Sequence, residues 1–300
     1  MVERAVSNIL SDWDVADYAL TELSEQSAYC APTLVHQDSR LSLPTVTLCA
    51  VTSVNLPATV AALRACLKQI DFAECLLFTD EMIPSVDPAI RVIPIPRIRA
   101  SHGYSEFLLG DFVDHLRTDH CLIVQWDGFV LDAKQWRPEF LSYDYIGAPW
   151  PHFGDEHDVG NGGFSFRSRK LLEACRDPRF RACHPEDLAI CRTNRSLLER
   201  EHGLRFADRS VAEAFAFERK VPGSPTFGFH GIFNLISALG PERFWEIYDG
   251  LDDRRTAFVD YRLLIRQLGV GRDALRRRSR LTADLLTSLV RRREFRSARW

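Results

Sequence analysis

Short apolar runs of strand length alternate with segments of helical periodicity in the first half of the chain, and this alternation constrains the fold most. The apolar runs that predict strands cover residues 45–53, 74–80, 90–96 and 121–124. The segments with helical spacing cover residues 58–70 and 104–120. Strands that alternate with helices at this pitch predict an α/β fold with a doubly wound, mainly parallel sheet flanked by helices.

The second half of the chain has a different residue composition. Between Trp136 and Phe166 the chain is rich in aromatic residues, glycine and proline, which predicts loops and short strands. Such loops often carry functional sites. The later pattern predicts helices near 168–175 and 210–217 and a short strand near 204–207.

Three parts are predicted along the chain of 300 residues. Residues 1–40 form a helical N-terminal extension, residues 43–240 the α/β domain, and residues 241–300 an arginine-rich helical C-terminal extension. The first part contains a predicted helix at about 4–24. No run of about 18 apolar residues and no signal-peptide core is found, so a cytoplasmic protein is expected.

The eight cysteines lie mostly in apolar or helical patterns, and no two of them form a Cys-x-x-Cys pair. Disulfide frameworks and zinc sites usually have more regular cysteine spacings. The cysteines are therefore expected to be reduced, buried thiols.

Charge is unevenly distributed, although the net formal charge is only -3. The last fifty residues contain 14 arginines and six acids, so the remaining 250 residues are strongly acidic. An acidic body argues against nucleic acid as a partner. Leucines in the C-terminal part, bracketed by arginine triplets, have the spacing of one helical face: Leu281, Leu285, Leu286 and Leu289. This helix either lies on an anionic membrane surface or packs its leucines on the body with solvated arginines.

Two common nucleotide-binding loops are absent. The chain has no Gly-x-x-x-x-Gly-Lys loop, and its first strand-to-helix turn lacks Gly-x-Gly-x-x-Gly, which argues against P-loop and nicotinamide enzymes. Carboxylates and one histidine instead occupy predicted strand ends and loops: Asp80, Asp127, Glu186, Asp187 and His230. Carboxylate oxygens suit a divalent cation, Mn or Mg, that is shared with substrate phosphates, and an imidazole ligand favours Mn.

Asp127 has the most informative position. It follows the apolar run 121–124 and precedes Gly128, so it lies where the chain turns at the rim of the predicted sheet. Ligands of open α/β sheets bind at this rim. The alternative interpretation is that Asp127 merely begins a turn.

Four motifs occur in a recognisable order: QWDGFV, VGNGGFSFRS, HPEDLAICR and FGFHG. This order resembles a bacterial family of glycosyltransferase-like proteins described as a domain of unknown function. More distantly, it resembles GT-A inverting glycosyltransferases of the fringe and β-galactosyltransferase kind, over about residues 43–240. The resemblance implies a GT-A-like, Rossmann-related sheet. It also implies a hexosyltransferase-like enzyme that uses a nucleotide-sugar donor, expected to be a UDP-sugar, with inversion by direct displacement.

By this resemblance, Gln125, Trp126 and Asp127 occupy the place of the Asp-x-Asp motif. Gln125 replaces the first acid, which implies weaker metal affinity but preserves a hydrogen bond to a sugar or ribose hydroxyl. Asp127 keeps the metal, and His230 matches a later metal-binding histidine. Without the resemblance, a lone histidine between aromatic residues is an ordinary core residue.

The resemblance also gives roles to the loops. Gly160, Asn161, Gly162 and Gly163 are expected beneath the donor sugar and acceptor, although Asn-Gly is also a common hairpin signal. The nucleotide is expected to meet residues at the first two strand ends: Thr52, Ser53 and Asp80. Diphosphate contacts are considered for Arg97 and Arg99.

The HPED motif supplies the expected base. Asp187 is chosen as the catalytic base, and Glu186 as a ligand of the acceptor hydroxyl and the alternative base. Acids at a helix start are common without any catalytic role, because they stabilise the helix by roughly 0.3 to 1 kcal/mol. His184 and His102 are lesser candidates without an assigned role.

Two other classes of function stay open at this stage. A two-carboxylate glycoside hydrolase would bind no nucleotide, and a degenerate transferase fold would serve as a sugar-binding or scaffold protein. Within the transferase hypothesis, retention of configuration also stays open. The acceptor is a glycan, lipid-linked or protein hydroxyl, with surface polysaccharide or glycolipid synthesis as one hypothesis.

Overall fold

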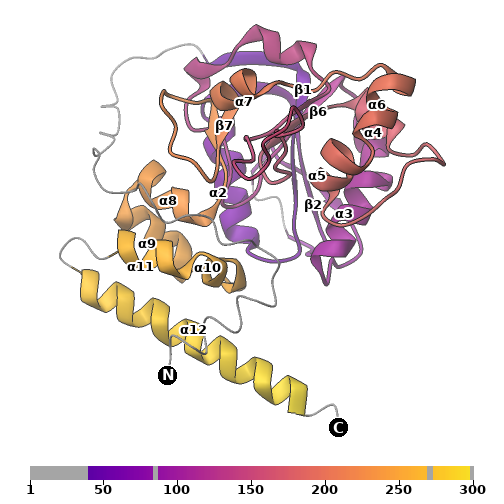
Figure 1. Ribbon diagram of the computed structural model, residues 1–300. Helices are drawn as coiled ribbons and strands as arrows, with labels where there is room; N and C mark the ends of the chain where they lie inside the picture. The colour runs from indigo at the N-terminus through magenta and orange to yellow at the C-terminus, as the bar shows by residue number, and fades with distance from the viewer. Residues whose placement is uncertain (1–39, 84–86, 269–272, 298–300) are drawn as a thin grey trace.

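The computed structural model describes residues 40–83, 87–268 and 273–297, with side chains described up to residue 290 (Figure 1). The predicted helix at about 4–24 lies outside the described residues. The described part is a mixed α/β structure with a central six-stranded sheet flanked by helices, which confirms the predicted fold class.

The sheet is mainly parallel. Its strand order is β3 (Arg91–Pro94), β2 (Ile70–Thr79), β1 (Leu41–Val51), β4 (His120–Ile123), β6 (Ser165–Ser168) and β5 (Tyr145–Ile146). The first four strands pair in parallel, whereas β6 runs antiparallel to both β4 and β5. The carboxyl ends of β1, β2 and β4 therefore share one edge of the sheet, which we call the carboxyl edge.

Strand β1 explains how the sheet is covered on both faces. Successive side chains of a strand point to opposite faces, and β1 is buried without interruption from Val46 to Val51. Leu48 and Ala50 join the hydrophobic cluster that contains α2 (Leu56–Leu67). Cys49 and Val51 join the cluster that contains α3 (Ser101–Leu109). The apolar run therefore forms a central strand between two helical layers.

The predicted helix at 104–120 is wrong in its extent. The chain breaks at Gly110 into α3 and a 3₁₀ helix, η1 (Asp111–His115), and then enters β4. Gly110 has φ -114° and ψ -100°, a backbone geometry outside the helical region. The helical pattern continues across this break because both pieces bury apolar residues against the same face of the sheet.

The site-bearing second half contains short elements. Two further 3₁₀ helices, η2 (Ala133–Gln135) and η3 (Pro138–Ser142), precede β5. The elements that follow β6 are helical: α4 (Arg169–Ala174), α5 (Glu186–Leu188), the π-helix η4 (Ala189–Thr193), α6 (Arg195–His202) and α7 (Arg209–Phe215). The predicted strand at 204–207 is reduced to one bridge between Phe206 and Tyr145. The predicted helix at 210–217 ends early, because its last two residues form β7 (Ala216–Phe217), which pairs in parallel with β8 (Gly228–Phe229).

Helices make up the described end of the chain: α8 (Ile232–Leu239), α9 (Pro241–Asp249), α10 (Arg255–Val259), α11 (Tyr261–Gln267) and α12 (Ala274–Ser297). They lie beside α2, and α12 runs along their outer side (Figure 1). Asn55, in the first strand-to-helix turn, donates to the Asp253 carbonyl at 2.8 Å and accepts from the Asp253 amide at 2.8 Å. This contact joins the C-terminal helices to the carboxyl end of β1.

The described residues test two expectations from the sequence, on the cysteines and on membrane-spanning helices. Six of the seven described cysteines are buried free thiols, and Cys183 is an exposed free thiol, which corrects the expectation that all are buried. Among the helices that the structure describes, none is long and apolar enough to span a membrane.

Candidate functional site

The QWDG motif forms a tight turn beyond β4 at the carboxyl edge. The Gln125 amide donates to the Gly128 carbonyl at 2.9 Å, and the Gly128 amide donates to the Gln125 carbonyl at 3.1 Å. Trp126 and Asp127 are thus the two central residues of the turn. Asp127 is only 5 % exposed, and its buried Oδ1 has no hydrogen-bond partner within the described part of the chain. A buried carboxylate oxygen without a partner is costly, so this atom is suited to a ligand.

His230 follows β8 and lies against this turn. Its Nε2 is 3.7 Å from Asp127 Oδ1 and 3.3 Å from Gln125 Oε1, and its Nδ1 is 3.3 Å from Glu218 Oε1. The backbone fixes the arrangement, because the Gly231 amide donates to the Asp127 carbonyl at 2.9 Å. QWDG and FGFHG, about a hundred residues apart in the chain, therefore form one cluster.

Opposing effects set the charges in this cluster. Burial raises the pKa of Asp127, and the positive His230 only partly offsets this effect. Burial acts against a charged His230, but the carboxylates of Asp127 and Glu218 raise its pKa above the usual value. The imidazole therefore lies between two carboxylates that both favour its positive form.

The spacing of Asp127 and His230 fits a shared divalent cation. Two ligands that bind one small cation at about 2.1 Å lie about 3 to 4 Å apart, and Asp127 Oδ1 and His230 Nε2 are 3.7 Å apart. Within the described residues, no group of three or more His, Cys, Asp or Glu side chains is placed to hold a metal ion. In the described part of the chain, these residue types thus offer two metal ligands at most at one place, and the remaining positions would belong to substrate oxygens, water or Gln125 Oε1.

Gln125 is held in one orientation by Tyr104. The Gln125 Nε2 donates to the Tyr104 hydroxyl at 3.1 Å, which leaves the carbonyl Oε1 facing His230 Nε2. Burial and the nearby negative Glu186 raise the pKa of Tyr104 and keep this phenol neutral. Gln125 therefore brings no charge to the cluster but directs an oxygen into it.

The glycine-rich loop lies in close contact with both the His230 cluster and the HPED motif. A Cβ atom on Gly163 would lie 2.0 Å from His230 Nε2, and a Cβ atom on Gly162 would lie 2.1 Å from Glu186 Oε1. Neither position has room for a side chain without displacing these groups. Glycine is needed here because the backbone passes between a candidate metal ligand and a candidate catalytic carboxylate.

Asn161 shapes this loop. It adopts a left-handed conformation with φ 69°, and its Oδ1 accepts from the Gly163 amide at 3.0 Å. Its Nδ2 is buried and has no hydrogen-bond partner within the described residues. The side-chain amide therefore keeps a donor available at the loop, next to Gly162.

Glu186 is locked in place by a fully buried arginine. Arg167 Nη2 donates to Glu186 Oε1 at 2.9 Å, and Arg167, which is 0 % exposed, also donates from Nε to Ser165 Oγ at 3.0 Å. The second oxygen of Glu186 accepts from the Ser105 hydroxyl at 3.3 Å. The charge of Glu186 is thus compensated inside the protein, and both carboxylate oxygens are engaged.

Asp187 has a different environment although it is the next residue. It is half-buried, and it accepts from the Gly162 amide at 3.1 Å and from the Leu188 amide at 2.8 Å. Burial and the negative charge of Glu186 raise the pKa of Asp187 to about 7. A carboxylate with a pKa near neutrality is well matched to accept a proton from a substrate.

The other predicted residues lie at the carboxyl ends of β1 and β2. Ser53 Oγ accepts from the Ile98 amide at 2.9 Å, and the Thr52 hydroxyl donates to the Val54 carbonyl. Asp80 Oδ2 is 3.9 Å from Arg97 Nε, while Asp80 Oδ1 is buried without a partner in the described part of the chain. Ser53 and Asp80 thus contact the 97–98 segment, and the role of all three side chains toward a nucleotide stays a prediction. Arg99 is exposed.

The lesser histidine candidates lie on the HPED side. His184 Nδ1 is 2.8 Å from Ser105 Oγ, so it extends the hydrogen-bonded chain that ends at Glu186. His102 pairs with Glu106 at 3.3 Å on the surface of α3. His184 is therefore connected to the site, whereas His102 contacts its own helix.

Four residues of the site were missed by sequence reasoning: Tyr104, Ser105, Arg167 and Glu218. Arg167 had a detectable signal, because it is the charged residue of an otherwise uncharged strand segment, GFSFRS. Such a residue needs a buried partner of opposite charge. The partners of Tyr104, Ser105 and Glu218 come from other segments of the chain, and the sequence neighbourhoods of these three residues give no comparable signal.

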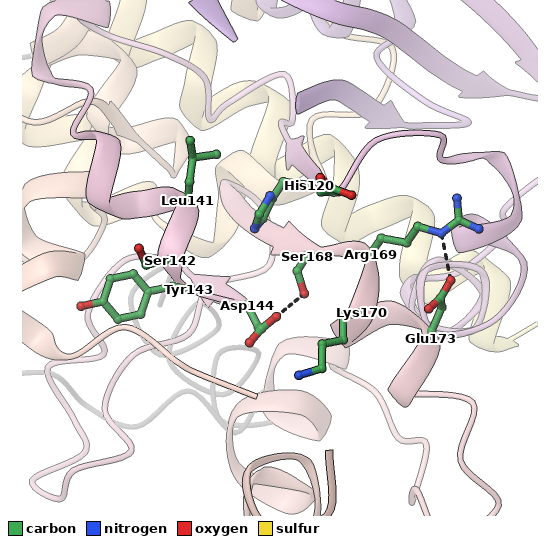
Figure 2. Close-up of a pocket in the computed structure, with 10 residues that line it drawn as sticks. His120, Leu141, Ser142, Tyr143, Asp144, Ser168, Arg169, Lys170 and Glu173 are labelled. Atoms are coloured by element: carbon green, nitrogen blue, oxygen red, sulfur yellow. Dashed lines mark hydrogen bonds and ion pairs between the residues drawn. The ribbon is translucent and has the colours of Figure 1, made fainter. Parts of the chain in front are cut away.

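A separate hollow lies at the opposite edge of the sheet, with a volume of about 390 Å³ (Figure 2). His120, Tyr143, Asp144 and Ser168 lie around it, together with the side chains of α4. Its polar groups are largely paired with one another: the Ser168 hydroxyl donates to Asp144 at 2.6 Å, and Arg169 pairs with Glu173 at 2.8 Å. The candidate catalytic groups are therefore at the carboxyl edge and not in this hollow.

Comparisons with known proteins can now be set beside this geometry. A family described as a protein of unknown function (DUF5672) matches residues 88–230, which span Asp127, Asn161, Asp187 and His230. A search of curated proteins finds no match.

Two solved structures are similar to this chain at low identity. One is an active-site mutant of LgtC, at 12 % identity and a TM-score of 0.42, over 69 % of this chain and 96 % of that one. The other is a glycosyltransferase involved in the glycosylation of the major capsid of PBCV-1. It has 11 % identity and a TM-score of 0.40, over 68 % of this chain and 98 % of that one.

Proposed function

We propose that this protein transfers a sugar from a nucleotide-sugar, a UDP-sugar, to a hydroxyl acceptor, with a divalent cation at Asp127 and His230. One observation carries the proposal. Two neighbouring glycines of one loop lie close to the two groups of site residues: Gly163 lies against His230, and Gly162 lies against Glu186. The Gly162 amide also donates to Asp187 at 3.1 Å, so a candidate cation ligand and the candidate proton acceptor lie against adjacent residues of the same loop.

Asp127 and His230 are the proposed cation ligands, and Gln125 Oε1 is a neutral oxygen beside them. A Mn or Mg ion held by these residues would neutralise negative charge on the leaving diphosphate. Trp126 and Gln125 are proposed to contact the donor from the same turn. Because Glu218 holds the Nδ1 side of His230, the imidazole presents Nε2 toward Asp127.

Asp187 is the proposed base. As the acceptor oxygen attacks the anomeric carbon, the bond from that carbon to the diphosphate oxygen breaks, and the acceptor proton moves to Asp187. A positioned general base contributes about 100- to 10,000-fold to such a step. Glu186 is held by Arg167 and Ser105, so its proposed task is to position the acceptor hydroxyl.

The remaining donor contacts follow the same proposal. Asn161 Nδ2, Gly162 and Gly163 are proposed to lie beneath the donor sugar. Thr52, Ser53 and the free oxygen of Asp80 are proposed to face the nucleotide, and Arg97 and Arg99 the diphosphate. The acceptor is proposed to be a glycan, lipid-linked or protein hydroxyl. Inversion is tested by the anomeric configuration of the product.

Nucleotide-dependent thermal stabilisation tests the proposal. Saturation at a hundred times the dissociation constant adds about 2.7 kcal/mol to the free energy of unfolding, a readily measured shift in Tm. UDP, GDP and CMP are each tested with and without Mn, on the wild type and on Asp127→Ala. We expect a Mn-dependent shift with UDP that the variant lacks. The proposal fails if no nucleotide shifts the Tm, and the hydrolase or the sugar-binding scaffold then takes its place.

A further inference from the structure

Helix α12 has an inner face that is fixed against the rest of the protein. Leu281 and Leu285 are buried on this face. The Tyr248 hydroxyl donates to Asp284 at 3.0 Å, and Arg254 pairs with Asp284 at 2.9 Å. These contacts set the rotation of the helix about its axis, so the residues on its other side are known.

The opposite side of α12 is apolar and exposed. Leu275 is 82 % exposed, Leu286 42 % and Val290 56 %. At 100° per residue, these three lie about 120° to 180° around the helix from Leu281. We call this side, from Leu275 to Val290, the outer face. The four predicted leucines thus divide: Leu281 and Leu285 pack on the body as one interpretation expected, Leu289 is half-buried, and Leu286 faces outward.

Arginines border the outer face. Arg276, Arg278 and Arg280 are exposed around its first half, and the next residues along the helix after Val290 are again arginines, at positions 291–293. The acid of α12 up to Val290 is Asp284, which contacts Tyr248 and Arg254 and also pairs with Arg280 of its own helix at 3.3 Å. The outer face therefore combines exposed apolar side chains with positive charge and has no acid of its own between residues 274 and 290.

We propose that the outer face of α12 binds the surface of an anionic phospholipid bilayer. Arginines on such a helix attract anionic headgroups, while leucine and valine enter the boundary between headgroups and acyl chains. Both chemistries are present on one side of a single helix. The helix lies along the surface in this arrangement and does not cross the bilayer.

Two other occupants fit less well. A second copy of the chain would bring the same arginines face to face, and like charges repel. A nucleic acid would use the arginines but not the exposed leucines, because its outer surface is a row of phosphates. The inference does not depend on the proposed sugar transfer, since it uses none of the residues of that site.

Vesicle sedimentation with the full-length protein tests the inference. Vesicles of phosphatidylcholine alone are compared with an equal mixture of phosphatidylcholine and phosphatidylglycerol. One variant combines Leu275→Ser, Leu286→Ser and Val290→Ser, and a second combines Arg276→Gln and Arg278→Gln. A matched control combines Met82→Ser and Val221→Ser, which remove exposed apolar side chains elsewhere.

We expect the wild type to bind the anionic vesicles only. The affinity for these vesicles should fall about fivefold for each arginine removed, which corresponds to about 1 kcal/mol for each charge. The triple apolar variant should lose about tenfold or more, since each leucine contributes apolar burial. The control should bind like the wild type, and all Tm values should agree. Equal binding to both vesicle types, or unchanged binding by the triple variant, would overturn the inference. So would a dimer that the triple variant disrupts, or binding to duplex DNA that the triple variant retains.

Discussion

Arg167 Nη2 and Glu186 Oε1 lie 2.9 Å apart in a buried ion pair, and this pair separates the roles of two adjacent carboxylates. The guanidinium compensates the charge of Glu186. The charge of Glu186 in turn helps to raise the pKa of Asp187 to about 7, after the larger effect of burial. Glu186 is thus tied to Arg167, while the pKa of its neighbour Asp187 lies near neutrality.

Arg167→Met should destabilise the protein strongly, because it leaves Glu186 buried without its partner. Breaking a buried ion pair in this way costs about 3 to 5 kcal/mol in the free energy of unfolding. Urea unfolding measures the loss. The double variant Arg167→Met, Glu186→Gln is the control, and it should recover part of the loss. If the single and double variants had equal free energies of unfolding, Arg167 and Glu186 would not be energetically coupled.

Asp187→Asn should lower kcat by about 100- to 10,000-fold if Asp187 is the base. Glu186→Gln should raise KM for the acceptor more than it lowers kcat. In the wild type, kcat/KM should rise as pH increases through about 7, because only the ionised Asp187 accepts a proton. Initial rates measured from acid to alkaline pH test both points. A flat profile in this range would remove Asp187 from the role of base.

Asp187 should also make stability depend on pH. Its pKa is raised from 3.8 to about 7, so the folded state holds a proton that the unfolded chain releases at lower pH. The free energy of unfolding should therefore fall as pH rises from about 4 to about 7, by about 1.4 kcal/mol per unit of pKa difference. Asp187→Asn should lack this decline and gain stability relative to the wild type at higher pH. Parallel pH curves for the two proteins would contradict the raised pKa.

Gly163→Ala should weaken cation binding, because the new methyl group would lie 2.0 Å from His230 Nε2 and displace the imidazole. Mn binding in the presence of UDP, followed by calorimetry, measures this effect, and we expect the affinity to fall at least about tenfold, or 1.4 kcal/mol. Gly154→Ala is the matched control, since no atom lies within 4 Å of its added Cβ. Unchanged Mn affinity in Gly163→Ala would argue against His230 as a ligand.

Gln125→Glu should strengthen cation binding. Gln125 Oε1 is 3.3 Å from His230 Nε2. The substitution puts a negatively charged carboxylate oxygen at about this position and so adds a negative charge to the cluster. At an effective dielectric constant near 20, one added charge at close range contributes more than 1 kcal/mol, so Mn affinity should rise about tenfold or more. The isosteric shape of glutamate preserves the contact with Tyr104. An unchanged or lower affinity would show that Gln125 does not face the cation.

Much of the fold could be predicted from local patterns. The buried run of β1 and the helical spacing of α2 are properties of consecutive residues, so their assignment did not require a partner. Asp127 was expected at the rim of the sheet because it follows an apolar run and precedes glycine, and it lies there. The extent of the helix after residue 104 was misjudged because both pieces that meet at Gly110 bury the same face.

The sequence by itself determined the alternation of strands and helices, the order of the four motifs and the arginine-rich end, because periodicity and composition are local properties. Only the tertiary structure decided which charges meet. Arg167 contacts Glu186, Glu218 contacts His230, and Gln125 contacts both Tyr104 and His230, although each pair comes from different elements of the fold. It also decided which leucines of α12 are buried, since that depends on the surface against which the helix packs. The energy of a buried charge depends on its neighbours in space, and the neighbours are set by the fold and not by the spacing along the chain.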